Sequence, residues 1–317
     1  MIVTRSWLNE WIDLKGITTE DLCKTFNAIG LEVDSLNTYN IPQKIVFGKV
    51  LECEKHPDAD KLNICKVDIG STTRQIVCGA SNVRTGLDVV VATIGAQMPG
   101  GLKIKPVKLR GIDSEGMICS ASEIGLDDVN EGILELDSSL EAFELGQEVS
   151  THPVFNDDVI EIELTANRGD CLSIRGVARD LSAALDRPLK DKKLYDSGNK
   201  KGVGRLLHLA HNKEIDISLN YKVLELKNLK LPMLVKLRLS QINESETSDI
   251  NSLILYTVHH SGVILRAYNF GFFCAENEIM AKVKLNEDEN GFVAIESEEL
   301  ASTIGVMQSE DSKVTYD

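Results

Sequence analysis

The sequence predicts a multidomain α+β protein in which a small antiparallel β-barrel is inserted in a small α/β domain and followed by a partial mixed α/β domain. Three observations predict this. The chain has 317 residues, which is long for one domain. Short strand-like runs separated by turn residues fill the stretch from about residue 41 to 149. Helical apolar patterns on both sides of that stretch leave faces that neither side can bury alone.

Residues 1–40 are expected to form the first part of the split α/β domain. In "GITTEDLCKTFNAIG", Thr18 is a predicted helix N-cap with Asp21 three residues later. Leu22 and Phe26 recur at helical spacing and predict one apolar face.

Residues 41–149 are predicted to form the barrel. The strand-like runs are "KIVFGKVLECEKH", "LNICKVDIG", "RQIVCGA", "DVVVATIG", "GLKIKPVKLRG" and "GILEL". They are spaced by about ten residues with no long helix between them, and about five strands in such a length are typical of an OB-type barrel.

Residues 150–195 return to a helical pattern and are expected to complete the split domain. In "ANRGDCLSIRGVARDLSAALDRPLK", Asp170 is the predicted N-cap, and Ile174, Val177 and Leu181 give an apolar face.

Residues 196–317 form the least regular part of the sequence. "SGNKKGVG" is typical of a flexible linker. The runs "LPMLVKLRL", "SLILYTV", "GVILRAY" and "IMAKVKL" then suggest strands of a partial domain.

The charge of the chain is segregated. The formal net charge is −15, yet residues 44–125 hold eleven basic and nine acidic residues, whereas residues 126–164 hold twelve acidic and no basic ones. A basic face on the barrel therefore stays compatible with the acidic total. No membrane span or secretory signal is evident, which predicts a cytoplasmic protein, and the seven scattered cysteines are expected to be reduced structural thiols.

The stretch "HPDADKLNICKVDIG" raises the question of a metal or acid/base site. His56, Asp58 and Asp60 alternate, but Pro57 interrupts an extended geometry, so a loop with aspartate-capped turns is the simpler interpretation. No nucleophile motif or phosphate-binding glycine loop is present. We therefore expect no catalytic residue, no metal ligand and no cofactor in this chain. The adjacent His259 and His260 would face opposite sides of a strand, one buried and one solvated.

The most basic segment is "GGLKIKPVKLRG". Lys103 and Lys105 alternate with apolar residues, and a bulge at Pro106 would bring Lys108 and Arg110 to the same face. Such a stripe could follow a phosphate backbone. A solvated strand face is the alternative, and it stays open from this segment alone.

The ordered series "VFGKVLECEKHPDADKLNICKVDIG", "IVCGASNVRTG", "VATIGAQMPGG", "IKPVKLRG" and "SEGMICSASEIGL" resembles the OB-fold tRNA-binding domain attached to several aminoacyl-tRNA synthetases. With "SWLNEWIDL" and "NAIGLEVDS" before the barrel and "IEIELTANRGDCLSIRGVARDLSAAL" after it, residues 1–190 resemble the β subunit of bacterial phenylalanyl-tRNA synthetase, and the chain is expected to correspond to an N-terminal portion of it.

The resemblance implies an α₂β₂ ligase that charges tRNA(Phe) with phenylalanine using ATP and Mg²⁺. In that family the α subunit carries the aminoacylation site, while the β subunit provides assembly, tRNA contacts and a site that hydrolyses mischarged tyrosyl-tRNA. Residues 196–317 would be a divergent or truncated form of this editing domain. Arg266 and Asn269 stand where the family usually has His and Asp, so no editing residue is carried over.

The predicted function is therefore assembly and tRNA binding within this ligase rather than aminoacylation chemistry. A free-standing tRNA-binding or chaperone-like module and a purely structural subunit fragment are the alternatives. The predicted tRNA-binding residues are basic side chains of the barrel and residues that match the family motifs: Lys61, Lys66, Asn82, Arg84, Lys103, Lys105, Lys108, Arg110, Ser114 and Met117.

Overall fold

The computed structural model describes residues 1–126, 129–190, 203–212, 222–244, 248–276, 278–287, 292–297, 302–310 and 313–316. The chain divides into two compact units. Unit 1 comprises Met1–Lys192 and Lys230–Leu265, and unit 2 comprises Lys193–Leu229 and Arg266–Asp317. Within the described ranges, no helix has the length and apolar character needed to cross a membrane.

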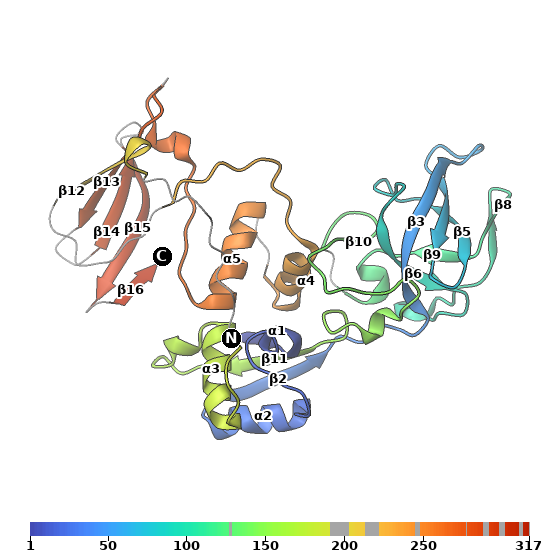
Figure 1. Cartoon of the computed structure of the whole chain (residues 1–317), viewed down its shortest axis with the longest axis horizontal. Helices are drawn as coiled ribbons and strands as arrows, with labels where there is room; N and C mark the ends of the chain where they lie inside the picture. Colours follow the sequence, from blue (N-terminus) through green and yellow to red (C-terminus); the bar gives the residue numbers. More distant parts are fainter. Residues whose placement is uncertain are drawn as a thin grey trace. The chain divides into compact units, whose positions relative to one another are not determined.

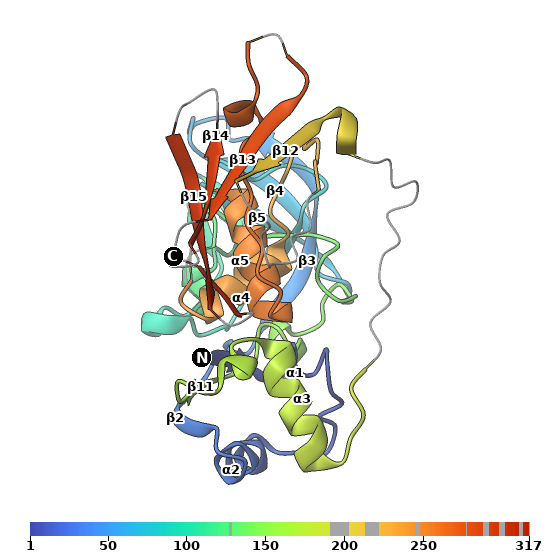
Figure 2. The same ribbon diagram turned by 90° about the vertical axis from the view of Figure 1, so that its left-hand side faces the viewer.

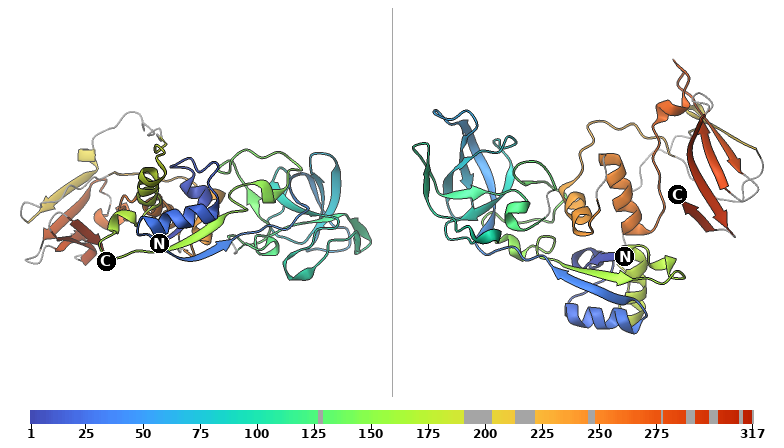
Figure 3. Two further views of the ribbon diagram at one scale, coloured as in Figure 1. Left: turned by 90° about the horizontal axis from the view of Figure 1, so that it is seen from below. Right: turned by 180° about the vertical axis from the view of Figure 1, so that it is seen from behind.

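In unit 1, a three-stranded antiparallel sheet joins two segments that are far apart in the sequence. Strand β11 (Asp158–Glu163) lies between β1 (Ile2–Thr4) and β2 (Glu32–Thr38). Figures 1 and 3 show β11, in green, running beside β2, in blue. The barrel strands all lie between β2 and β11 in the chain. The barrel is thus an insertion in a small α/β domain, which confirms the predicted fold class.

Three helices complete this split domain: α1 (Arg5–Leu8), α2 (Thr19–Ala28) and α3 (Ile174–Leu185). Helices α1 and α3, from opposite ends of the split, lie side by side (Figure 2) and share one apolar core. Helix α2 begins as predicted, with the Asp21 amide donating to Thr18 Oγ1 over 3.1 Å. The core is formed by Val3, Trp7, Leu8, Ile12, Leu14, Leu22, Phe26, Leu31, Ile160, Ile162, Cys171, Ile174, Val177, Ala178, Leu181, Val235, Leu239 and Ile242.

The N-terminus of α3 differs from the prediction. Its cap is Ser173, whose Oγ accepts the Gly176 amide hydrogen over 3.0 Å. Asp170 does not cap the helix, because its carboxylate accepts hydrogen bonds from Arg168 and Arg179. Gly176 allows the tight turn: a Cβ there would lie 1.9 Å from the Asp170 carbonyl oxygen.

The barrel is an antiparallel sheet with strand order β10-β6-β3-β4-β5, and β9 also pairs with β6. Its strands are β3 (Ile45–Lys55), β4 (Asn63–Asp68), β5 (Thr73–Cys78), β6 (Asp88–Thr93), β9 (Gly116–Ile118) and β10 (Glu135–Leu136). A hairpin of β7 (Val107–Leu109) and β8 (Ile112–Ser114) precedes β9. Short 3₁₀ helices of unit 1 are Pro99–Gly101, Ser122–Ile124, Val149–Thr151 and Gly169–Cys171.

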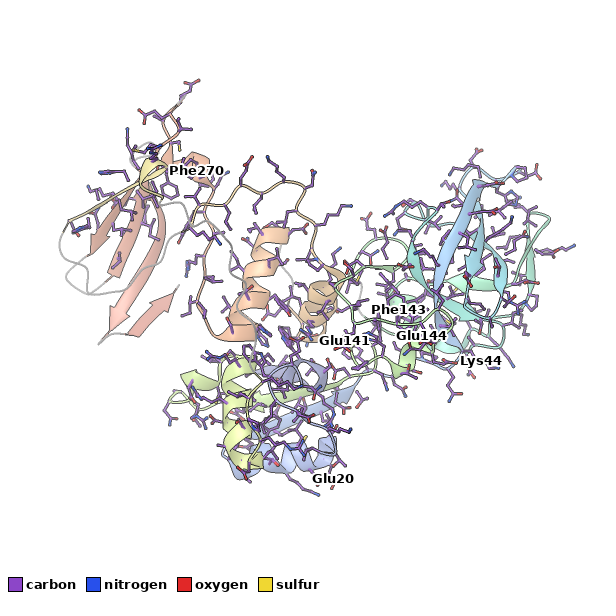
Figure 4. The ribbon with its side chains drawn as sticks, in the orientation of Figure 1. Glu20, Lys44, Glu141, Phe143, Glu144 and Phe270 are labelled. Carbon is purple, nitrogen blue, oxygen red and sulfur yellow. The ribbon has the colours of Figure 1, made fainter. Side chains whose placement is uncertain are left out.

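The barrel is nearly closed by contacts between β5 and the residues around β8. The Glu115 amide donates to the Gln75 carbonyl over 2.8 Å, and the Gln75 side chain donates to the Asp113 carbonyl over 2.8 Å. Phe143, labelled in Figure 4, stacks on Phe47 with ring centroids 4.3 Å apart, so the loop after β10 contributes to the barrel core. The predicted OB-type barrel is confirmed.

Two runs that the sequence suggested as strands are helices of unit 1. "LPMLVKLRL" forms α4 (Met233–Gln241) and "SLILYTV" belongs to α5 (Asp249–Ser261). Ser248 caps α5 by accepting from the Asn251 amide, and Gly262 ends it at φ 76°. The strand prediction was wrong because a short apolar run without alternation fits a buried strand and a helix equally well.

In unit 2, five strands form a mixed sheet in the order β12-β13-β14-β15-β16. They are β12 (Leu207–His211), β13 (Ala281–Glu287), β14 (Phe292–Ser297), β15 (Ser302–Glu310) and β16 (Lys313–Tyr316), and only β12 and β13 pair in parallel. The 3₁₀ helices Val203–Arg205 and Phe270–Phe273 accompany them. "IMAKVKL" overlaps β13 as predicted, "GVILRAY" lies outside regular structure beyond Gly262, and most of "SGNKKGVG" lies outside the described residues.

Candidate nucleic-acid interface

Two adjoining hollows mark one side of the barrel. The larger, which we call the hairpin groove, has a volume of about 1050 Å³ and lies between the end of β5, residues 102–109, β9 and the segments 120–123 and 129–133. The smaller, the loop groove, has a volume of about 700 Å³ and lies between the ends of β3 and β4 and residues 79–85. Gly79 and Ala80 line both grooves, which therefore meet at these two small residues.

The full lining of each groove is as follows. The hairpin groove is lined by Val77, Cys78, Gly79, Ala80, Leu102, Lys103, Ile104, Lys105, Val107, Leu109, Ser114, Gly116, Met117, Ile118, Ser120, Ser122, Glu123, Val129, Asn130, Glu131, Gly132 and Ile133. The loop groove is lined by Cys53, Lys55, Asp60, Lys61, Asn63, Gly79, Ala80, Ser81, Val83, Arg84 and Thr85.

His56 joins the loop between β3 and β4 to the β7–β8 hairpin. The ring is buried, with only 4% of the residue exposed. Its Nδ1 accepts the Asp58 amide hydrogen over 3.1 Å, and its Nε2 lies 3.2 Å from the Leu109 carbonyl oxygen. This arrangement requires a ring with its proton on Nε2, which donates to Leu109. His56 thus fixes the positions of elements that line the two grooves.

The same contacts correct the predicted role of the aspartates in "HPDAD". The turn is closed by His56 and by the Leu62 amide donating to the Ala59 carbonyl over 3.0 Å. Among the described residues, no hydrogen bond is recorded for the carboxylates of Asp58 and Asp60. The turn is therefore held by an imidazole and by the backbone rather than by aspartate caps.

Four of the predicted basic residues have no ion pair within the described part of the chain: Lys61, Lys103, Lys105 and Arg110. All four are exposed. Lys103 and Lys105 line the hairpin groove, Lys61 lines the loop groove, and Arg110 lies at the tip of the β7–β8 hairpin with φ 49°. Within the described residues, the structure thus brings positive charge without an ion pair to both grooves and to the tip of the β7–β8 hairpin.

The other three predicted basic residues each face a carboxylate. Lys66 Nζ lies 2.6 Å from Glu52, and Lys108 Nζ lies 3.8 Å from Asp113. Arg84 donates to both oxygens of Glu135 over 2.9 and 2.8 Å, which lowers the pKa of the Glu135 carboxyl. Lys66 and Lys108 line neither groove. Their charges are already balanced within the barrel.

Asn82 and Ser114 hold the barrel together. The Asn82 amide donates to the Ile133 carbonyl over 2.9 Å and accepts the Ile133 amide hydrogen over 3.0 Å. Ser114 Oγ accepts the Val77 amide hydrogen over 3.1 Å and donates to the Gly116 carbonyl over 3.2 Å. Ser114 is 2% exposed. These two side chains therefore shape the walls of the grooves and have little hydrogen-bonding capacity left for a ligand.

Met117 and three exposed apolar side chains give the hairpin groove its apolar character. Met117 is half-buried against the barrel core. Leu102, Val107 and Leu109 are 58%, 47% and 38% exposed, respectively. The alternation in this segment does not show which apolar side chains are exposed. In the structure, Val107 and Leu109 belong to the two-stranded β7–β8 hairpin, whereas Ile104 joins the barrel core.

A second cluster of ionisable groups lies beside α3. Asp170, Cys171 and Asp180 bring their ligand-type atoms within 4.8 Å of one another. The Arg168 guanidinium donates to both carboxylates and lies 2.8 Å from the Cys171 sulfur. Burial raises the pKa of the Cys171 thiol to about 11. Arg168 thus supplies the positive charge that these carboxylates need.

Three comparisons relate the chain to known proteins. Residues 45–144, which contain the barrel strands, match a family described as a putative tRNA binding domain. The sequence is 62% identical to the phenylalanine–tRNA ligase β subunit of Sulfurimonas denitrificans and 45% identical to that of Campylobacter jejuni (strain RM1221); each match covers 100% of this chain and 41% of the relative. The chain therefore spans about two fifths of the length of these curated relatives.

Among solved structures, the C-terminal domain of Plasmodium vivax p43 is similar over 35% of this chain and 59% of its own, with 26% sequence identity and a TM-score of 0.25.

Proposed function

We propose that this chain, a homologue of the phenylalanine–tRNA ligase β subunits over about two fifths of their length, provides assembly and tRNA binding in a phenylalanine–tRNA ligase. One observation carries the tRNA-binding part. The segment that matches a tRNA-binding domain is the same barrel that presents Lys61, Lys103 and Lys105 around two grooves, with no ion pair to any residue that the structure describes. Lysines without a protein partner are available to replace the counterions of RNA phosphates.

The activity of the whole enzyme follows from the same homology. The ligase would charge tRNA(Phe) with phenylalanine as an α₂β₂ enzyme that uses ATP and Mg²⁺, with the aminoacylation site on the catalytic α subunit. This chain would contribute no catalytic residue. We do not propose editing, because Arg266 and Asn269 occupy the positions where the family usually has His and Asp.

The domain organisation that we propose has four parts. Residues 1–40 and 150–195 form the split α/β domain, residues 41–149 form the tRNA-binding barrel, and residues 196–317 form a divergent or truncated editing-like domain, whose helices α4 and α5 pack in unit 1 against the split domain. The split domain supports this proposal through the shared core of its helices and the sheet β1-β11-β2.

The predicted site residues divide into two groups by their surroundings. We propose that Lys61, Lys103, Lys105 and Arg110 contact phosphates directly. Lys66, Arg84 and Lys108 add weaker contacts, since each already faces a carboxylate. Asn82, Ser114 and Met117 act by shaping the grooves.

The tRNA-binding part is tested by fluorescence anisotropy of labelled tRNA(Phe) with this chain at several salt concentrations. Neutralising about four phosphates predicts that log affinity falls with log salt with a slope of roughly −3. Lys44→Gln is the matched control, because Lys44 has no recorded ion pair in the described residues and lines neither groove. Absent or salt-insensitive binding would contradict a tRNA role of the barrel and favour a purely structural subunit.

Membership of the ligase is tested separately by co-purification with the catalytic α subunit of the same cell. The expected result is a stable complex that charges tRNA(Phe) when the rest of the β subunit is supplied. If the chain bound tRNA but a β subunit containing it never captured the α subunit, a free-standing tRNA-binding module would be the better description.

A further inference from the structure

We infer that the hairpin groove receives an unpaired stretch of RNA, whose bases lie against its aliphatic wall, rather than an RNA duplex. This inference depends on the proposed function and names the part of the RNA that the barrel binds. Leu102, Val107 and Leu109 line the groove with 58%, 47% and 38% of their surface exposed, and we call these three side chains its aliphatic wall. Exposed apolar side chains gathered at one groove mark a surface with a ligand of its own.

The chemistry of the wall discriminates between forms of RNA. A duplex presents phosphates and 2′-hydroxyls outward and keeps the faces of its bases stacked inside. Neither phosphates nor hydroxyls gain from contact with Leu102 or Val107. An unpaired nucleotide exposes an apolar base face, and covering that face together with the aliphatic wall removes both from water.

The charged residues of the groove lie where such a strand needs them. Lys103 and Lys105 are exposed and alternate with Ile104, which is 6% exposed and forms part of the barrel core. Leu102 precedes the two lysines and Val107 follows them, so apolar and basic side chains share one rim. A single strand alternates bases with phosphates in the same way.

Other residues that line the groove offer polar groups to the edges of bases. Ser120 and Ser122 line the groove, and Glu123 beside them accepts the Ser120 amide hydrogen over 2.7 Å. Glu131 adds a second carboxylate. Carboxylate and hydroxyl oxygens accept hydrogen bonds from the amino groups of unpaired bases, and the two carboxylates repel a phosphate. These lining residues therefore favour base edges over a duplex backbone.

The loop groove extends the path. It shares Gly79 and Ala80 with the hairpin groove, and it adds Lys55 and Lys61. A strand that crosses this junction would have basic residues at both ends. The two grooves together therefore suit several consecutive nucleotides rather than one.

None of the side chains that line the hairpin groove, all within the described residues, is aromatic. Proteins that bind single strands tightly usually stack bases on aromatic rings. The hairpin groove is therefore expected to bind single strands weakly and with little sequence preference. Placing a ring on the wall should strengthen the binding, which gives the inference a gain-of-function test.

The experiment compares three probes by anisotropy with the whole chain: tRNA(Phe), a twelve-nucleotide single-stranded oligouridine, and an RNA hairpin whose duplex stem carries a similar number of phosphates. The expected result is that oligouridine competes with tRNA more effectively than the hairpin does. Val107→Tyr is expected to tighten oligouridine binding by about tenfold, the gain of one stacked base, with little effect on the hairpin. Leu102→Tyr repeats this test at the other end of the wall.

Two variants complete the design. Lys103→Gln combined with Lys105→Gln should weaken oligouridine binding by about tenfold, whereas Lys44→Gln on the same barrel should leave it unchanged. A duplex that binds as well as the single strand, with no gain from either tyrosine, would overturn the inference and leave the tRNA-binding proposal intact. An acidic polyglutamate peptide that displaces oligouridine and gains equally from the tyrosines would also overturn it, in favour of a protein ligand. If tRNA itself does not bind, both proposals fail.

Discussion

The barrel and the split domain use basic side chains in opposite ways. In the split domain, basic side chains form hydrogen bonds and ion pairs with groups of the same domain. Arg187 donates to the backbone carbonyls of Asp13 and Lys15, and Arg168 bridges Asp170 and Asp180. In the barrel, several basic side chains extend into solvent beside two grooves with no acidic partner in the described residues.

This difference shows why net charge is a poor guide to what a protein binds. The chain carries a formal charge of −15, and yet a local surface with unpaired lysines remains. What matters for an RNA phosphate is whether a cation has already been neutralised, because a paired lysine must break one contact to make another. The following predictions test whether the two regions really differ in this respect.

The largest effect is expected from removing the unpaired cations of the barrel together. Gln in place of Lys61, Lys103, Lys105 and Arg110 should lower tRNA affinity by about a hundredfold or more at 0.1 M salt and bring the salt slope close to zero. The free energy of unfolding should stay within about 0.5 kcal/mol of the wild type, since these side chains are exposed and unpaired. Anisotropy and urea denaturation measure the two quantities, and a large loss of stability would mean that these cations are structural after all.

The reverse pattern is expected for a buried arginine of the split-domain core. Arg238 on α4 is 2% exposed, forms an ion pair with Glu10 and donates to the Tyr256 hydroxyl over 2.8 Å. Arg238→Ala should reduce the free energy of unfolding by about 3 kcal/mol, because it removes a buried guanidinium together with its ion pair to Glu10 and its hydrogen bond to Tyr256. Lys236→Ala on the same helix is the control and should cost less than about 0.5 kcal/mol. The tRNA affinity of the folded fraction should not change; a loss of affinity would place RNA contacts outside the barrel.

An intermediate effect is expected at His56, which serves stability and binding together. His56→Ala removes two hydrogen bonds and a buried ring, and should cost about 2 kcal/mol of stability. His56→Asn keeps an acceptor for the Asp58 amide, whereas His56→Gln keeps a donor within reach of the Leu109 carbonyl. Hydrogen exchange in the β7–β8 hairpin should therefore rise more with Asn than with Gln.

The same variants show whether His56 positions the basic hairpin. If it does, tRNA affinity should follow the order wild type, Gln, Asn, Ala rather than follow overall stability alone. Equal affinity in all variants at a temperature where they are folded would limit His56 to a structural role.

Much of the barrel and the split domain could be predicted because their signals are local. Alternating strands, turn residues and the Thr18 cap each act within a few residues. The errors arose where two local signals competed or where none was decisive. Both Asp170 and Ser173 are good N-cap residues, and the tertiary contacts of Arg168 and Arg179 engage Asp170. The cap Ser248 and the terminator Gly262 around α5 were present in the sequence, but the apolar residues between them also suit a strand.

The site was predictable in composition but not in organisation. Lysine-rich alternation pointed to residues 103–110, yet it could not show that Lys108 faces Asp113 whereas Lys105 has no ion pair within the described ranges. Such pairing depends on strand register, which decides which residues of two neighbouring strands lie opposite each other. The roles of His56 and Asn82 were missed for the same reason, since their partners Leu109 and Ile133 lie more than fifty residues away. Adjacent His259 and His260 were expected on a strand, but α5 is helical and both rings pack against Trp7.

The smallest effect is expected at Arg84, the barrel cation with the best-formed ion pair. Hydrogen bonds from Arg84 hold the pKa of Glu135 below its usual range. Glu135 therefore contributes stability that is fully present above its unfolded pKa of about 4.3 and is lost as pH falls through the lower, folded value. Arg84→Gln should remove this contribution and make the acid limb of the unfolding curve less steep, at a cost below about 1 kcal/mol at neutral pH because the pair is partly exposed. Arg110→Gln, which removes a cation of the same barrel that has no ion pair, should leave the acid limb unchanged and reduce tRNA affinity more than Arg84→Gln does. Urea denaturation between pH 3 and 7 and anisotropy with tRNA(Phe) measure the two effects; if the two variants behave alike in both, pairing does not decide which barrel cations bind RNA.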